Sequence, residues 1–173
     1  AMKTLYLLRH AKSSWDDPTL SDHDRPLAPR GRDAAPRMAV WLRTQARRPD
    51  LVICSTAARA RETWELVARE LQPAPEVDVR RSVYDAGPEQ LIAVARGAPA
   101  NVETLMLVGH NPAMEEAAAL LARDGDARAL ATMQSKYPTA AVAELTFEVD
   151  RWQEIGRDTG HLARFVRPKD LAE

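Results

Sequence analysis

The sequence predicts an α/β fold, one three-layer α/β/α domain over residues 1–173 with a mostly parallel central sheet. Short apolar runs typical of buried strands alternate with segments whose apolar residues recur at helical spacing. The length of 173 residues suits one domain with its own core. No repeat, linker or low-complexity segment divides the chain, so we expect a single domain.

The first predicted strand, residues 3–8, reads Lys-Thr-Leu-Tyr-Leu-Leu. Residues 9–29 are polar and rich in Asp, Ser and Pro, and a loop of this length inside a domain is usually functional or disordered. Apolar residues at helical spacing then predict a helix over residues 31–46. Pro36 is expected near the first turn of that helix, where proline is best tolerated.

Residues 51–54 form a second apolar run, which ends at Cys54 and predicts a buried strand. Either Ser55 or Thr56 is suited to cap the helix that follows. Its predicted buried face consists of Ala60, Trp64, Val67 and Leu71. Because four residues, not five, separate Cys54 from Arg59, the pair lacks the spacing of a cysteine phosphatase loop, and we interpret Cys54 as a buried structural residue.

The second half of the chain continues the alternation of predicted strands and helices. A weak strand over residues 76–80 and a short helix over 88–96 precede a third strong strand at 104–108. Asn111 is expected to cap the next helix, with Pro112 at its first position. Late strands are predicted over residues 141–147 and 162–166.

Composition excludes several classes of function. The chain is 45% hydrophobic and 28% charged with a formal net charge of −1, which argues against a nucleic-acid binder that relies on bulk basicity. No apolar run approaches the roughly 18 residues of a membrane span. A single cysteine allows no intramolecular disulfide, and no secretory leader pattern is present. We therefore expect a cytoplasmic protein that binds neither membranes nor nucleic acids.

Reactive side chains follow all three strong strands. Arg9 and His10 follow the first, Arg59 lies one turn into the helix after the second, and His110 follows the third. In parallel α/β sheets, ligands bind beyond the carboxyl ends of the strands. We therefore expect these four residues to meet at one edge of the sheet.

The expected pocket suits a phosphoryl group. The forked guanidinium groups of Arg9 and Arg59 match phosphate oxygens, and two helix N-termini would favour an anion. Like-charge repulsion from the arginines should keep both imidazoles neutral, and a neutral ring nitrogen can act as a nucleophile. The arginines supply the charge that a metal would otherwise bring, so we predict no metal and no cofactor. His23 and Asp24 resemble two metal ligands but lack partners at ligand spacing, which favours a solvated loop.

Three motifs together resemble those of the histidine phosphatase (phosphoglycerate-mutase-like) superfamily. They are Leu-Leu-Arg-His-Ala at 7–11, Ser-x-x-x-Arg-Ala-x-x-Thr at 55–63 and Val-Gly-His-Asn-Pro at 108–112. The segment Asp-His-Asp-Arg-Pro-Leu at 22–27, followed by Arg-Gly at 30–31, is similar to the SixA-type phosphohistidine phosphatase branch. The resemblance implies a phosphoglycerate-mutase-like fold, and the short chain leaves little room for a cap domain.

The resemblance also implies roles for individual residues. His10 matches the nucleophile that becomes phosphorylated, Arg9 and Arg59 match phosphate-binding arginines, and His110 matches the second pocket histidine. Arg25 matches an arginine of the phosphohistidine branch that either contacts substrate or braces the loop through Asp22 or Asp24. The general acid is open between Asp85 and Asp22, and a leaving imidazole could dispense with one. Ala11 and the pair Thr56-Ala57 depart from the common glycine and Pro-Leu.

The function expected first is hydrolysis of phosphohistidine on a protein, because a site without a cap could admit a protein side chain. The alternatives are a phosphatase of small phosphate monoesters and a phosphate-binding module without catalysis. The expected partners are a phosphorylated protein or a small phosphate ester, and phosphate, sulfate, vanadate or tungstate should bind the pocket.

Overall fold

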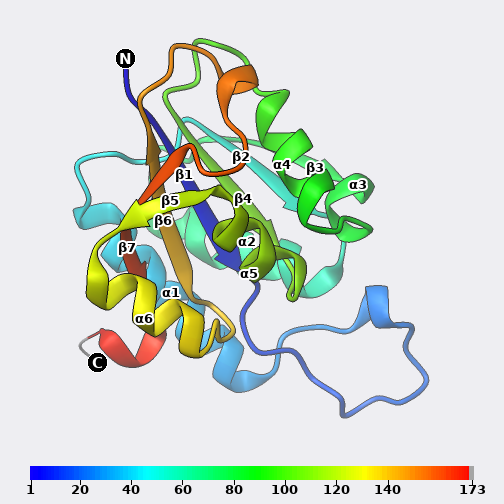
Figure 1. Ribbon diagram of the computed structural model, residues 1–173. Helices are drawn as coiled ribbons and strands as arrows, with labels where there is room; N and C mark the ends of the chain where they lie inside the picture. The colour runs from blue at the N-terminus through cyan, green and yellow to red at the C-terminus, as the bar shows by residue number, and fades with distance from the viewer. Residues whose placement is uncertain (172–173) are drawn as a thin grey trace.

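The computed structural model describes residues 1–171 and is built around a seven-stranded sheet (Figure 1). The strand order is β3-β2-β4-β1-β6-β7-β5, so the first strand of the chain lies at the centre. The strands are β1 (Lys3–Arg9), β2 (Leu51–Ser55), β3 (Glu76–Arg80), β4 (Thr104–Gly109), β5 (Ala122–Gly125), β6 (Val142–Phe147) and β7 (Gly160–Val166).

Parallel pairing dominates this sheet, as predicted. Strands β3, β2, β4 and β1 are all parallel neighbours, and β7 pairs with β5 in parallel. Strand β6 is antiparallel to both β1 and β7. Strands β1, β2 and β4 are buried almost throughout, which explains their nearly continuous apolar sequences. Their parallel arrangement places the carboxyl ends of all three at one edge.

Helices cover both faces of the sheet and complete the three-layer α/β/α architecture. On one face, α1 (Pro29–Thr44) and α2 (Ala58–Glu70) pack Met38, Leu42 and Val67 against the sheet. On the other face lie α4 (Pro88–Arg96), α5 (Ala113–Leu121) and α6 (Ala127–Ser135). No helix within residues 1–171 is long and apolar enough to cross a membrane.

Three predicted helix starts were wrong. The first helix begins at Pro29, so Pro36 lies inside it and not in its first turn. The second begins at Ala58, and neither Ser55 nor Thr56 caps it, because the N-cap is Ala57. The third begins at Ala113, one residue beyond Pro112, although the side-chain oxygen of Asn111 still accepts a hydrogen bond from the Glu115 amide at 3.2 Å.

The long loop after β1 is an ordered structure with its two ends tied together. Ser13 forms an isolated antiparallel bridge with Leu27, and the Ala28 amide donates to the Lys12 carbonyl at 2.8 Å. The loop carries the short 3-10 helix η1 (Asp22–Asp24), which contacts α2. In Figure 1 it extends from the lower edge of the sheet, beyond the end of β1. The fold thereby holds Asp22 and Arg25 close to the site.

Candidate active site

Four side chains from three strand ends meet at this edge, as the sequence predicted. The imidazole rings of His10 and His110 lie 5.2 Å apart between centroids. The charges of Arg9 and Arg59 reach both rings and lower the pKa of each. Arg9 is the last residue of β1, and Arg59 is the second residue of α2, not one turn into that helix.

His10 is oriented by its own backbone. The His10 amide donates to the Gly109 carbonyl at 3.0 Å, and Nδ1 lies 2.7 Å from the Ala11 carbonyl oxygen. A carbonyl oxygen can only accept, so Nδ1 must carry the proton in this contact. In the neutral ring this places the free electron pair on Nε2. The chemically available nucleophile is therefore His10 Nε2.

His110 is oriented by Ser55. His110 Nε2 lies 2.7 Å from Ser55 Oγ, which accepts a hydrogen bond from the Ala57 amide at 3.1 Å. The serine hydroxyl can donate its own proton to Nε2, and the ring proton then lies on Nδ1. His110 Nδ1 is buried and has no hydrogen-bond partner within residues 1–171. This tautomer would offer an N–H donor toward an incoming oxygen.

Both imidazoles are kept neutral mainly by burial. Burial, together with the charges of His110, Arg59 and Arg9, lowers the pKa of His10 to about 3. Burial and Arg59 lower the pKa of His110 to about 4, although Asp22 opposes this shift. The sequence predicted neutrality from arginine repulsion alone. The outcome is as predicted, but desolvation is the larger cause.

The carboxylate of Asp22 contacts the guanidinium groups of Arg59 and Arg25 and supplies a negative charge to the site. Its Oδ2 accepts hydrogen bonds from Arg59 Nη2 at 3.0 Å and from the Tyr84 hydroxyl at 2.7 Å, and its main-chain carbonyl accepts from Arg59 Nη1 at 2.7 Å. Its Oδ1 lies 3.5 Å from Arg25 Nε. The hydrogen bond from Tyr84, more than those from Arg59, lowers the pKa of Asp22. Asp22 is therefore ionised at neutral pH.

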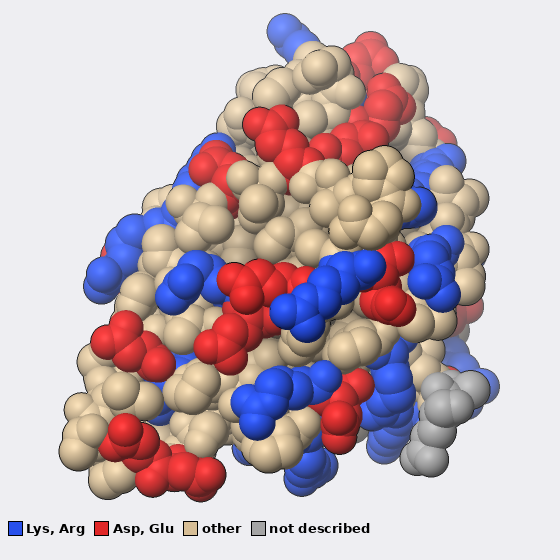
Figure 2. Space-filling view, turned by 180° about the vertical axis from the view of Figure 1, so that it is seen from behind, with Lys and Arg blue, Asp and Glu red and all other residues tan. Residues whose placement is uncertain are grey.

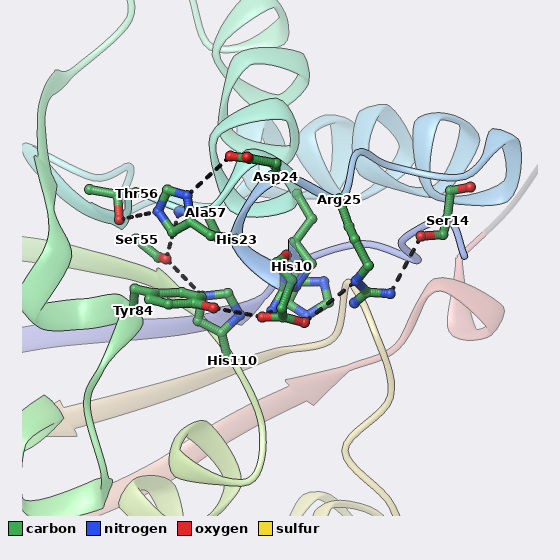
Figure 3. Close-up of polar contacts among 12 residues, drawn as sticks. His10, Ser14, His23, Asp24, Arg25, Ser55, Thr56, Ala57, Tyr84 and His110 are labelled. Atoms are coloured by element: carbon green, nitrogen blue, oxygen red, sulfur yellow. Dashed lines mark hydrogen bonds and ion pairs between the residues drawn. The ribbon is translucent and has the colours of Figure 1, made fainter. Parts of the chain in front are cut away.

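Arg25 is buried at the outer side of this cluster. Its guanidinium carbon lies 3.4 Å from the ring centroid of Trp15, a cation–π contact, and Trp15 is 71% exposed. In Figure 3, Tyr84 and His110 lie on one side of His10 and Arg25 lies on the other. The contact with Asp22 corresponds to the loop-bracing alternative for Arg25.

Asp85, the other candidate general acid, forms its ion pair with a residue outside the active-site cluster. It follows the short helix α3 (Arg81–Tyr84), is exposed, and pairs with Arg81 across 3.4 Å. His23 was expected in a solvated loop. It is half-buried, and its Nε2 lies 2.8 Å from Thr56 Oγ1. No group of three or more His, Cys, Asp or Glu side chains within residues 1–171 is arranged to hold a metal ion.

Three residues of the site were not assigned a role from the sequence. Tyr84 donates a hydrogen bond to Asp22, and its ring lies edge-on to that of His110 with 5.5 Å between the centroids. Ser55 orients His110. The Tyr137 carbonyl accepts a hydrogen bond from Arg9 Nη1 at 2.8 Å. Ser55 lies in the second arginine motif, so that motif could have identified it. The roles of Tyr84 and Tyr137 depend on tertiary contacts that no local pattern shows.

The depressed histidine pKa values predict that folding stability falls in acid. The pKa of His10 is about 3 in the folded protein and near 6.5 in the unfolded chain. Between these two pH values, the folded protein binds fewer protons at this histidine than the unfolded chain does. The free energy of unfolding therefore decreases as pH falls through this window, by about 1.4 kcal/mol per pH unit for each such histidine. Urea unfolding from pH 7 to pH 4.5 should show a shallower decrease for His10→Asn than for the parent. An equal decrease would mean that His10 titrates normally in the folded protein.

Comparisons with known proteins agree with this site. A family model of the histidine phosphatase superfamily (branch 1) matches residues 5–83, which contain Arg9, His10 and Arg59. An uncharacterized protein of Mycobacterium tuberculosis is 37% identical over 164 residues, which cover 94% of this chain and all of that protein.

Two solved structures are similar over nearly the whole chain. A candidate phosphohistidine phosphatase SixA from Agrobacterium tumefaciens superposes with a TM-score of 0.79 at 31% identity, covering 96% of this chain and 99% of the other. Another, from Nakamurella multipartitia, has a TM-score of 0.82 at 28% identity and covers 97% of both chains.

Proposed function

Because this chain belongs to the histidine phosphatase superfamily, in its SixA-type branch, we propose that it hydrolyses phosphohistidine on a protein through a phosphorylated His10. The observation that carries the proposal is the state of His10: a buried, neutral ring whose Nδ1 hydrogen bond leaves Nε2 as the nucleophile, beside two guanidinium groups. We infer that this domain acts in the cytoplasm and needs no cofactor for the reaction.

The proposed reaction has two steps. His10 Nε2 attacks phosphorus, the P–N bond to the substrate imidazole breaks, and that imidazole leaves with a proton taken up from solvent. Water then attacks phosphorus, the bond to Nε2 breaks, and inorganic phosphate leaves. Arg9 and Arg59 neutralise the equatorial oxygens in both steps, and His110 Nδ1 donates to one of them. Positioning and charge stabilisation are the main demands of phosphoryl transfer.

The state of the carboxylates supports phosphohistidine as the substrate. Tyr84 and Arg59 hold Asp22 ionised, and Asp85 is paired with Arg81 on the surface. An ionised or distant carboxylate is a poor proton donor to an alkoxide leaving group. The imidazole of phosphohistidine is a weaker base than an alkoxide, so its departure makes less demand on an enzymatic acid.

The test compares phosphate release from a phosphohistidine protein, a phosphoserine peptide and p-nitrophenyl phosphate. We expect kcat/KM for the phosphohistidine protein to exceed that for the phosphoserine peptide by at least about 10²-fold, a factor comparable to general acid catalysis. Turnover of small esters without any turnover of phosphohistidine proteins would contradict the proposal.

Asp22→Asn separates two roles for this residue. If Asp22 competes with substrate for Arg59, the variant should bind tungstate up to about fivefold more tightly, since a partly exposed ion pair contributes about 0.2–1 kcal/mol. Turnover of phenyl phosphate, which has a poor leaving group, should change little. If Asp22 is instead the general acid, phenyl phosphate turnover should fall by about 10²-fold or more while p-nitrophenyl phosphate is spared. Asp24→Asn is the matched control, because Asp24 is exposed in the same 3-10 helix and its Oδ1 lies 3.5 Å from His23 Nδ1, not beside Arg59.

A further inference from the structure

A basic groove lies beside the active site and is not used in the proposed reaction. It is a hollow of about 310 Å³ between the start of α1, the turn at residues 138–139 and the segment from 167 to 169. Its charged lining consists of Lys12, Arg30, Asp33, Arg37, Arg167 and Lys169. Five cations and one carboxylate therefore line a single groove on a protein whose formal net charge is −1.

The fold places these cations on one surface. Arg30, Asp33 and Arg37 occupy positions i, i+3 and i+7 of α1, which share one helix face. Arg37 Nη1 donates to the Pro168 carbonyl at 3.3 Å, which joins α1 to the 3-10 helix η3 (Pro168–Asp170) carrying Lys169. In Figure 2, which looks onto the face covered by α1 and α2, blue side chains gather at the lower centre and right, over α1 and η3.

Most of these cations have no carboxylate partner. Arg167 forms a two-pronged ion pair with Asp170. Lys12, Arg30 and Lys169 are exposed, and within residues 1–171 none of them, nor Arg37, has a carboxylate oxygen within 4.0 Å. Four guanidinium or ammonium groups thus retain their charge toward solvent. Such a groove attracts anionic groups and raises the rate at which an anionic partner associates.

Residues of the groove are joined to the backbone of the catalytic residues. Lys12 follows His10 by two residues, and the Ala140 amide, next to the turn at 138–139, donates to the carbonyls of Arg9 and His10 at 3.1 Å. The Tyr137 carbonyl just before that turn holds Arg9. A macromolecule with its phosphoryl group at His10 would lie over the groove if its surface extends past the turn at 138–139.

We propose that this groove docks an acidic surface segment of the phosphoprotein substrate, an inference that rests on the proposed function. The spacing of the charges favours a chain segment over a small ion. Arg30 and Arg37 are seven helical residues apart, about 10 Å along the axis, so their charges match several anionic groups spread over a surface better than one small ion. Several carboxylates on one protein surface are such groups. Complementary charge of this kind acts mainly on association and on the choice of partner.

Charge reversal in the groove tests this inference. The probe is a phosphotransfer domain with an acidic surface, phosphorylated on histidine by phosphoramidate, and phosphoramidate itself is the small P–N substrate. The double variant Arg30→Glu/Lys169→Glu should lower kcat/KM for the phosphorylated domain by about tenfold or more, mainly through KM. Its turnover of phosphoramidate should stay within about twofold of the parent. Arg69→Glu, an exposed arginine on α2 outside the groove, is the control and should change neither rate.

Salt provides a second readout. Added NaCl should reduce kcat/KM of the parent toward the phosphorylated domain and reduce that of the double variant much less, because screening removes an attraction that the variant has already lost. Two results would overturn the inference: equal rates of the double variant and the parent on the domain, or an equal loss on both the domain and phosphoramidate. Failure of the proposed function is distinct, since the parent itself would then not dephosphorylate the domain.

Discussion

Replacement of His10 by alanine is expected to lower phosphatase turnover by at least about 10⁴-fold, as removal of a nucleophile does in other covalent enzymes. The expectation follows from the hydrogen bond between Nδ1 and Ala11, which leaves Nε2 as the attacking atom, and from the low pKa of the buried ring. The measurement is steady-state hydrolysis of a phosphohistidine protein and of p-nitrophenyl phosphate at pH 7.

His161→Ala is the matched control for this experiment. His161 is exposed on β7, where its Nδ1 lies 2.8 Å from Asp124, and it contributes nothing to the site. The control should retain the activity of the parent. If His10→Ala loses less than about tenfold while His161→Ala is normal, His10 does not form the covalent intermediate.

Replacement of Arg59 by alanine should be the next most damaging change. The guanidinium of Arg59 is buried beside both imidazoles, and its charge lowers the pKa of each. An arginine that stabilises a transferring phosphoryl group contributes about 10³- to 10⁵-fold to turnover, and we expect a loss in that range. Arg59→Lys should recover only part of it, because an ammonium group cannot bind two oxygens as a fork.

The control for this variant is Arg61→Ala. Arg61 lies two residues later on α2, is exposed, and donates from Nε to the Thr56 carbonyl at 2.9 Å. Tungstate affinity should fall in Arg59→Ala and remain normal in Arg61→Ala. Normal tungstate binding and turnover in a folded Arg59→Ala protein would show that Arg59 serves only to hold Asp22.

The central part of the fold could be predicted from the sequence for a physical reason. Strands β1, β2 and β4 are buried on both faces, so their sequences are almost purely apolar, and the polar residues that follow them mark their ends. Parallel pairing then places Arg9, Arg59 and His110 at one edge without any further information.

The elements that were missed lack such a pattern. Strand β5 reads Ala-Arg-Asp-Gly at the edge of the sheet, where β7 is its partner, so its sequence shows no apolar alternation. Helix α6 buries only Ala129 and Met133 and begins at Ala127, capped by Asp126, whose side chain accepts from the Ala129 amide at 2.9 Å. Edge and surface elements of this kind are specified mainly by tertiary contacts.

The site was predictable where one motif carries one role, and not where two distant segments meet. Asp22 was considered as an acid, but its ion pair with Arg59 joins residues 37 positions apart. The ends of this loop are tied together by the hydrogen bond between Ala28 and Lys12, and the Leu27 amide donates to Glu62 of α2. Tyr84 is 62 positions from Asp22, so no local sequence pattern could predict the hydrogen bond between them. This hydrogen bond is the largest cause of the lowered pKa of Asp22.

The most direct test is to trap the phosphorylated enzyme. The protein would be mixed with a ³²P-labelled phosphohistidine protein, quenched within milliseconds in alkali, in which phosphohistidine survives, and digested for mass spectrometry, with ³¹P NMR to identify the phosphorylated nitrogen. We predict one phosphoryl group on His10, attached at Nε2 because Nδ1 is engaged with Ala11, and none in His10→Ala. Phosphate on His110, on Nδ1 of His10, or on no residue during active turnover would contradict this account.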